Sequence, residues 1–182
     1  MEGRWFHVTF ATYGTWLPGD PRGFRTRHHR EHVEGDYRSP PPAGRYEHRH
    51  EHSRRLLVAE PVRFTPQERQ SVLAALVERL RRGDALVVAA AVGREHVHLV
   101  FKCPAAEVRR LVGLAKKHAW FVLRNRGRPG RIWAKRCRAE PIRDRAHQLN
   151  AVRYVLRHAG SSAAVWRFGQ PIEAKGVEAD RT

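Results

Sequence analysis

The sequence has little of several features that mark common classes of protein. Its 2 cysteines, Cys103 and Cys137, form neither a CxxC motif nor a disulfide framework. No apolar run approaches the ~20 residues that a membrane-spanning helix needs. Arg4 and His7 interrupt the N-terminal segment, so it lacks the apolar core of a secretory signal. We therefore expect a cytoplasmic protein of bacterial type with reduced thiols.

Acidic residues are also scarce relative to basic ones. The chain has 18 Asp and Glu against 35 Lys and Arg, a formal net charge of +17, and an isoelectric point near 11.3. Such an excess favours a polyanionic partner, nucleic acid above all. A membrane surface is the alternative, but no Lys/Arg-rich helix carries bulky apolar residues on its other face. We expect a nucleic-acid partner, no membrane and no small-molecule cofactor.

Residues 84–102, DALVVAAAVGREHVHLVFK, contain two apolar runs separated by Gly93-Arg94-Glu95. This pattern predicts a β-hairpin. In the second strand His96 and His98 leave the sheet on one face, because side chains alternate along a strand. Neutral imidazole is a common metal ligand, so two rings on one face of an apolar strand predict a metal site. The alternative is a pair of hydrogen-bonded surface histidines.

Three helices are predicted from apolar residues at helical spacing. The first begins after a capping box of Thr65 and Glu68 and ends before Gly83, and the second covers residues 105–125. The third covers residues 144–159, with an apolar stripe of Leu149, Val152, Leu156 and Ala159. Another helix face groups His147, Asn150, Ala151, Tyr154 and His158.

Two further strands are predicted, over residues 4–12 and near residues 140–144, with another possible at residues 56–61. The order of elements fits an α+β fold, a ferredoxin-like sandwich whose antiparallel sheet has its helices packed on one face. The strand with the two histidines is central in such a sheet, and Tyr154 and His158 project toward it.

We expect one domain over residues 1–168 and a flexible tail over residues 169–182. The domain contains an irregular polar insertion at about residues 25–55, rich in His, Arg and Glu. Its histidines have charged neighbours instead of a fixing sheet, so we interpret them as solvated or phosphate-contacting groups. They are His28, His29, His32, His48, His50 and His52.

A basic segment follows the second helix. Arg131, Lys135 and Arg136 surround Trp133, a combination that suits single-stranded nucleic acid, with cations on phosphates and the ring on a base. A solvated loop anchored in the core by Trp133 is an equally good interpretation. The candidate DNA-binding residues are Lys116, Lys117, Arg131, Trp133, Lys135, Arg136 and Arg153.

Three stretches together resemble the single-tyrosine HUH transposases, and most closely the REP-associated tyrosine transposases. They are FATYGTWLPGDPRGF at residues 10–24, HVHLV at residues 96–100, and IWAKRCRAEPIRDRAHQLNAVRYVLRHAG at residues 132–160. The resemblance covers roughly residues 6–160, apart from the insertion. The chain departs from the family after the last helix, where His158-Ala159-Gly160 stands in place of an Asn-Pro pair.

The resemblance implies that Tyr154 is the nucleophile, with Tyr13, Tyr37 and Tyr46 as weaker candidates, and that His96 and His98 are metal ligands. His158 stands where the family often has Gln or Asn and is a third candidate ligand. Mg²⁺ or Mn²⁺ is the expected ion, and a nitrogen-rich set also accepts Co²⁺ or Zn²⁺. A basic neighbour such as Lys116, Lys117 or Arg153 would favour the Tyr154 phenolate. The family acts on single-stranded or hairpin DNA, as a monomer or a homodimer.

Three functions are compatible with the sequence. The first is a metal-dependent transposase or endonuclease that cleaves and rejoins single-stranded DNA through a 5′-phosphotyrosine intermediate. The second is a domesticated relative that binds structured nucleic acid without cutting it. The third is a metal-dependent phosphodiesterase that uses water. The combination of His96, His98 and Tyr154 favours the first.

Overall fold

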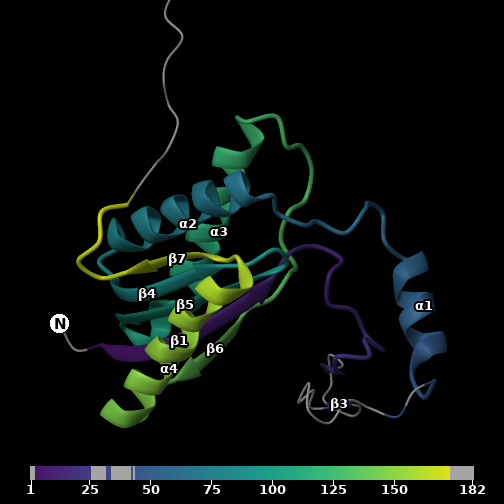
Figure 1. The fold of residues 1–182 in the computed structure, drawn as a ribbon, viewed down its shortest axis with the longest axis horizontal. Coiled ribbons are helices and arrows are strands. Elements are labelled where there is room, and N and C mark those ends of the chain that lie inside the picture. Colours follow the sequence, from purple (N-terminus) through teal and green to yellow (C-terminus); the bar gives the residue numbers. More distant parts are fainter. Residues whose placement is uncertain (1–2, 26–31, 34–41, 43, 173–182) are drawn as a thin grey trace, which may run out of the picture. The chain divides into compact units, whose positions relative to one another are not determined.

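The computed structural model describes residues 3–25, 32–33, 42 and 44–172 (Figure 1). The chain forms two compact units, Met1–Ala11 with Arg63–Thr182, and Thr12–Val62. Part of the predicted insertion and residues 173–182 of the predicted tail lie outside the described residues.

A five-stranded sheet is the centre of the first unit. Its strand order is β6-β1-β5-β4-β7, and neighbouring strands are antiparallel. The strands are β1 Arg4–Ala11, β4 Leu86–Val92, β5 His96–Cys103, β6 Arg138–Pro141 and β7 Ala164–Arg167. The predicted hairpin is confirmed as β4 and β5, and β5 is the middle strand, as expected for the strand with the two histidines.

One face of the sheet is covered by α2 (Pro66–Arg81) and α3 (Val108–Arg124) (Figure 1). Alternation along β5 directs Val97, Leu99 and Phe101 to this face, and all three are fully buried. The predicted capping box of Thr65 and Glu68 begins α2. A short 3₁₀ turn, Ala105–Glu107, precedes α3.

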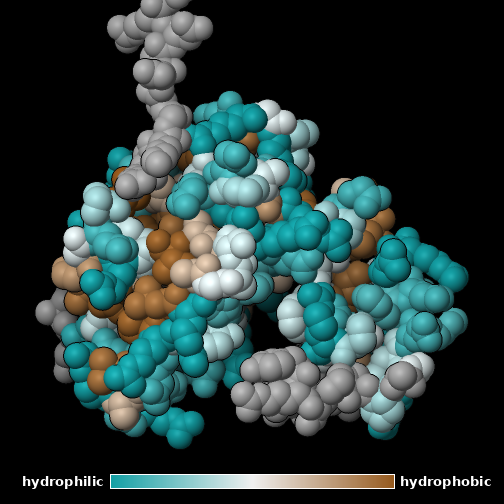
Figure 2. Space-filling model, in the orientation of Figure 1, coloured by the Kyte–Doolittle hydropathy of each residue, from teal (hydrophilic) through white to brown (hydrophobic). Residues whose placement is uncertain are grey.

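The other face of the sheet carries α4 (Arg145–Arg157), which a 3₁₀ turn at His158–Ser161 continues. Ala151 and Val155 of α4 pack against Ala89, Ala91 and Val100 of the sheet. The α+β class and the antiparallel sheet are confirmed, and the helices divide between both faces instead of sharing one. Figure 2 shows apolar surface over β4 and β7 beside α4, where Val88 and Val165 are only partly buried.

Helix α4 is rotated relative to its predicted apolar stripe. Its buried residues are Gln148, Ala151 and Val155, whereas Leu149 is 39% exposed and Ala159 is exposed. The small side chains of Ala151, Ala89 and Ala91 let the helix approach the sheet closely along this line. The rotation turns Tyr154 and His158 toward the sheet face that carries His96 and His98.

The second unit contains the short pair β2 (Phe24–Arg25) and β3 (His32–Val33) and the helix α1 (Glu47–Arg55). The prediction of irregular structure was wrong for α1, a helix with no buried residue. No strand forms at residues 56–61. The loop before β2 is fixed by Asp20, which is 2% exposed and accepts hydrogen bonds from the Arg22 guanidinium at 2.9 and 2.7 Å.

Candidate metal and tyrosine site

The middle strand presents His96 and His98 toward α4. His98 is 8% exposed and pairs across the sheet with Thr9, while His96 begins the strand opposite Ala11. Their ring centroids are 5.0 Å apart. The sheet therefore fixes both rings side by side on one face, as the alternation of the sequence predicts.

Helix α4 and the 3₁₀ turn that continues it supply two more side chains to this face. Asp144 caps its first turn by accepting a hydrogen bond from the His147 amide at 2.8 Å. Near the other end, Tyr154 and His158 are one turn apart, with ring centroids at 4.9 Å. The Tyr154 ring lies 5.3 Å from that of His98, and the His158 ring lies 4.4 Å from it.

His96, His98 and His158 converge. One ring nitrogen from each can be chosen so that all three atoms lie within 4.8 Å of one another. Three imidazoles are a good donor set for a borderline transition ion, whereas Mg²⁺ prefers oxygen ligands. The residues therefore fit a divalent metal, with Mn²⁺, Co²⁺ or Zn²⁺ more suitable than Mg²⁺.

The hydrogen bond of His158 determines which of its nitrogens can ligate. Its Nδ1 lies 3.0 Å from the backbone carbonyl oxygen of Tyr154. A carbonyl oxygen only accepts, so Nδ1 carries the proton and donates. The lone pair of Nε2 is then left for a metal, the usual arrangement of a ligating histidine with an outer hydrogen bond.

His7 is a fourth histidine at the site, and no motif in the sequence marks it. Its Nε2 lies 3.2 Å from His98 Nδ1, and the two rings stack at 5.4 Å. Burial is the largest cause that lowers the pKa of His7; the charge of Glu140 opposes it, and repulsion from Arg138, His147 and His158 adds to it. The alternation of β1 puts His7 on this face, but sequence alone does not give the register that places it beside His98.

Burial also controls the charge of His98. It is the largest cause that lowers the pKa of His98 to about 2, and repulsion from His96, His158 and His7 adds to it. His98 is therefore neutral at ordinary pH, which is the form that binds metal.

Comparison with solved structures bears on this arrangement. The chain is similar to the solved structure of a REP-associated tyrosine transposase bound to a REP hairpin, with a TM-score of 0.50 and 14% identity. The match covers 88% of this chain and 70% of the other. The chain has the fold of a REP-associated tyrosine transposase. A scan against protein-family models and a search of curated proteins both find no match.

The basic residues predicted to lie near Tyr154 are found on both faces of the sheet. Lys116 and Lys117 lie on α3, across the sheet from Tyr154, so they are not its basic neighbours. Lys116 Nζ donates to the carbonyl oxygen of Ala134 at 2.7 Å, and burial lowers the pKa of Lys116. Arg153 remains, exposed on α4 next to Tyr154.

Trp133 has the role of core anchor, one of the two that the sequence left open. It is 9% exposed, and its indole nitrogen donates to the carbonyl oxygen of Lys116 at 2.8 Å. Its ring meets those of Phe10 and Phe64 edge-on at 5.1 and 5.5 Å. Arg131, Lys135 and Arg136 are exposed around this anchor.

A hollow of about 630 Å³ lies beside α4. It is lined by Asn150, Arg153, Leu156 and Arg157. Arg157 was not among the predicted binding residues. Its spacing of four from Arg153 is the signal that could have identified it, because residues at i and i+4 share a helix face.

The histidines of the predicted insertion do not form a second metal cluster among the residues that the structure describes, where the only group found is His96, His98 and His158. His48, His50 and His52 lie on α1, where a spacing of two turns neighbouring rings to different sides of the helix. In the described part of the chain, no helix is long and apolar enough to span a membrane.

Proposed function

We propose that this protein is a metal-dependent enzyme that cleaves and rejoins single-stranded, hairpin-associated DNA through a covalent bond to Tyr154. The observation that carries the proposal is the placement of the Tyr154 ring 5.3 Å from His98 and 4.9 Å from His158, beside the convergent imidazoles. The fold shared with a hairpin-bound transposase supports it.

In the proposed reaction, the Tyr154 oxygen attacks the phosphorus of a backbone phosphodiester. The new bond joins the phenol oxygen to the phosphorus, and the bond from phosphorus to the 3′-oxygen breaks. The phenol gives up its proton to solvent, the 3′-oxygen takes up a proton and leaves as a free hydroxyl, and the 5′-phosphate stays on Tyr154. Attack by a 3′-hydroxyl on the phosphotyrosine reverses these changes and rejoins DNA without an external energy source.

His96, His98 and His158 would hold the divalent ion, which when bound polarises the phosphate and favours the phenolate. His158 Nδ1–H donates to the backbone carbonyl oxygen of Tyr154. The histidine that would bind the metal is therefore also hydrogen-bonded to the residue that carries the nucleophile. Tyr154 is 44% exposed, which leaves its hydroxyl open to a DNA strand. All four side chains belong to one chain, so no second copy is needed to assemble them.

The test is adduct formation on a stem-loop oligonucleotide labelled at its 3′ end. Because the proposed bond retains the 3′ fragment, the label should move to the mass of the protein in Mn²⁺ and not in chelator. Tyr154→Phe should abolish the adduct, and Tyr46→Phe, in the second unit, is the matched control. Salt-sensitive DNA binding with no adduct in any metal would instead indicate a non-cleaving binder. Cleavage that survives Tyr154→Phe would indicate hydrolysis by water.

A further inference from the structure

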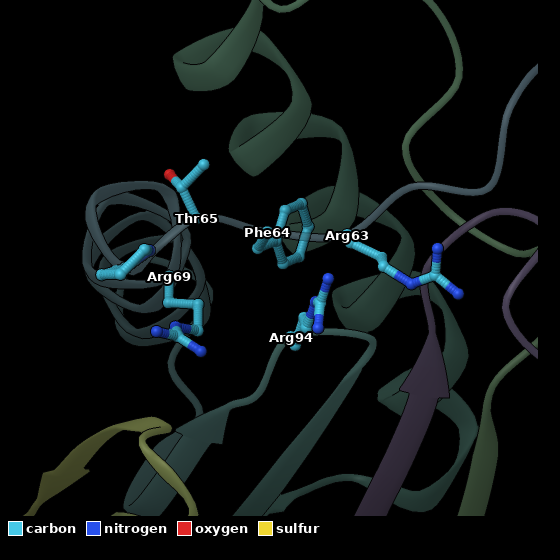
Figure 3. A pocket seen from close by; sticks show the side chains of 6 residues that line it. Arg63, Phe64, Thr65, Arg69 and Arg94 are labelled. Carbon is cyan, nitrogen blue, oxygen red and sulfur yellow. The ribbon is translucent and has the colours of Figure 1, made fainter.

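A pocket of about 350 Å³ lies at the beginning of α2, apart from the tyrosine site (Figure 3). Its lining residues come from the segment before α2, from the first turns of α2, and from the turn between β4 and β5. They are Arg63, Phe64, Thr65, Pro66, Arg69 and Arg94. Three of the six are arginines and none is acidic.

The positive charge of the pocket is only partly balanced. Arg63 Nε donates to Glu95 Oε1 at 2.8 Å. Glu68, the acidic residue of the α2 capping box, is already bonded to Thr65 and to Arg128. Within the described part of the chain, the guanidinium groups of Arg69 and Arg94 form no ion pair or side-chain hydrogen bond. Two such like charges beside one hollow favour an anion between them.

The walls of the pocket are fixed to the strand that carries the candidate metal ligands. The Phe64 amide donates to the carbonyl oxygen of Arg94 at 2.8 Å, and the Phe64 side chain is 3% exposed. Gly93, next to Arg94, packs so closely that a Cβ there would lie 3.3 Å from His96 Cε1. The pocket and His96 therefore lie at the same end of the sheet, joined by the short turn between β4 and β5.

We propose that this pocket binds a backbone phosphate of the DNA strand that reaches Tyr154. The planar guanidinium groups of Arg69 and Arg94 suit a phosphate, which each can bind with two hydrogen bonds. A strand leaving the tyrosine site over the β4–β5 turn arrives at the pocket, so a phosphate held there fixes the register of the strand. This inference rests on the proposed function for the identity of the strand, but its test is a binding measurement.

The experiment compares single-stranded DNA binding by the full chain and by Arg69→Gln/Arg94→Gln, using fluorescence anisotropy at several salt concentrations. We expect about a tenfold loss of affinity, as for the removal of a charged hydrogen bond. The slope of log affinity against log salt should fall by about 0.7 for each phosphate that the variant no longer binds. The matched control is Arg81→Gln/Arg109→Gln, two exposed arginines near the other end of the sheet, where β5 ends.

Equal affinities of the two double variants would overturn the proposal. Inorganic phosphate is the second probe, because a free phosphate offers the same chemistry. Binding of inorganic phosphate that disappears in Arg69→Gln/Arg94→Gln while DNA affinity is unchanged would assign the pocket to a free anion and also overturn it. If the proposed function is wrong, the unmodified protein forms no covalent adduct with DNA. The comparison of DNA affinities between the two double variants can still be made in that case.

Discussion

His7 Nε2 on β1 and His98 Nδ1 on β5 lie 3.2 Å apart, which links the outer histidine to the buried one. For His98 to ligate through Nε2, its Nδ1 must carry the proton and donate to His7. His7 is then an acceptor that fixes the ring and the tautomer of His98, as partners of ligating histidines commonly do.

His7→Phe should therefore weaken Mn²⁺ or Co²⁺ binding by about 10- to 100-fold, because it removes the acceptor of the His98 Nδ1–H. Phe keeps an aromatic ring at this position, so the variant changes the hydrogen bond more than the packing. His7→Gln should recover much of the affinity, since its amide oxygen can accept from His98. Titration calorimetry of the protein without DNA measures both. His118→Phe, on α3 across the sheet, is the control. Equal metal affinity in His7→Phe and the control would show that His7 does not position His98.

Trp133 should contribute more to stability than to DNA binding. Trp133→Ala removes a ring that is 9% exposed, together with its hydrogen bond to Lys116. We expect the free energy of unfolding to fall by about 3–5 kcal/mol, the range for large aromatic truncations in a core. Urea denaturation measures it, with Trp16→Ala, an exposed tryptophan, for comparison. If Trp133→Ala left the stability unchanged and reduced the DNA affinity, Trp133 would instead be a residue that stacks on a base.

The Asp20–Arg22 pair predicts a pH dependence of stability. Burial alone would raise the pKa of Asp20, but hydrogen bonds and charge from Arg22 outweigh it together and lower the pKa below 3.8. A carboxyl group whose pKa is lower in the folded than in the unfolded state stabilises the protein at pH values above its unfolded-state pKa. This contribution is lost as the pH falls through the folded-state pKa.

Asp20→Asn should therefore be less stable than the unmodified chain at neutral pH, by about 1.5–3 kcal/mol for a charged hydrogen bond. The difference should shrink as the pH falls below 3.8, where the unmodified Asp20 begins to lose its advantage. Urea denaturation of both proteins over a pH series provides the measurement. A difference that stays constant into strong acid would contradict the lowered pKa.

The sequence was sufficient where local patterns decide the structure. Alternation in HVHLV placed His96 and His98 on one face, and Thr65 with Glu68 marked the beginning of α2. The spacing of four between Tyr154 and His158 put both on one side of α4. These features depend on neighbours in the chain, so one sequence reveals them.

Features that depend on tertiary packing were missed. Strand β7 has four residues and forms because β4 offers it an edge. The rotation of α4 follows from the small residues Ala89, Ala91 and Ala151, which outweigh the larger Leu149 in setting the packing of the helix. The bond between His7 and His98 requires the register of β1 against β5, which no local pattern specifies.

Locating the nucleotide on the protein tests the covalent role of Tyr154. After reaction with a stem-loop DNA in Mn²⁺ and nuclease trimming, mass spectrometry of the digested protein identifies the modified tyrosine. We expect a phosphodiester-linked nucleotide on the peptide containing Tyr154, and none on that peptide when metal is chelated. A nucleotide on Tyr13, Tyr37 or Tyr46 with Tyr154 unmodified would contradict it.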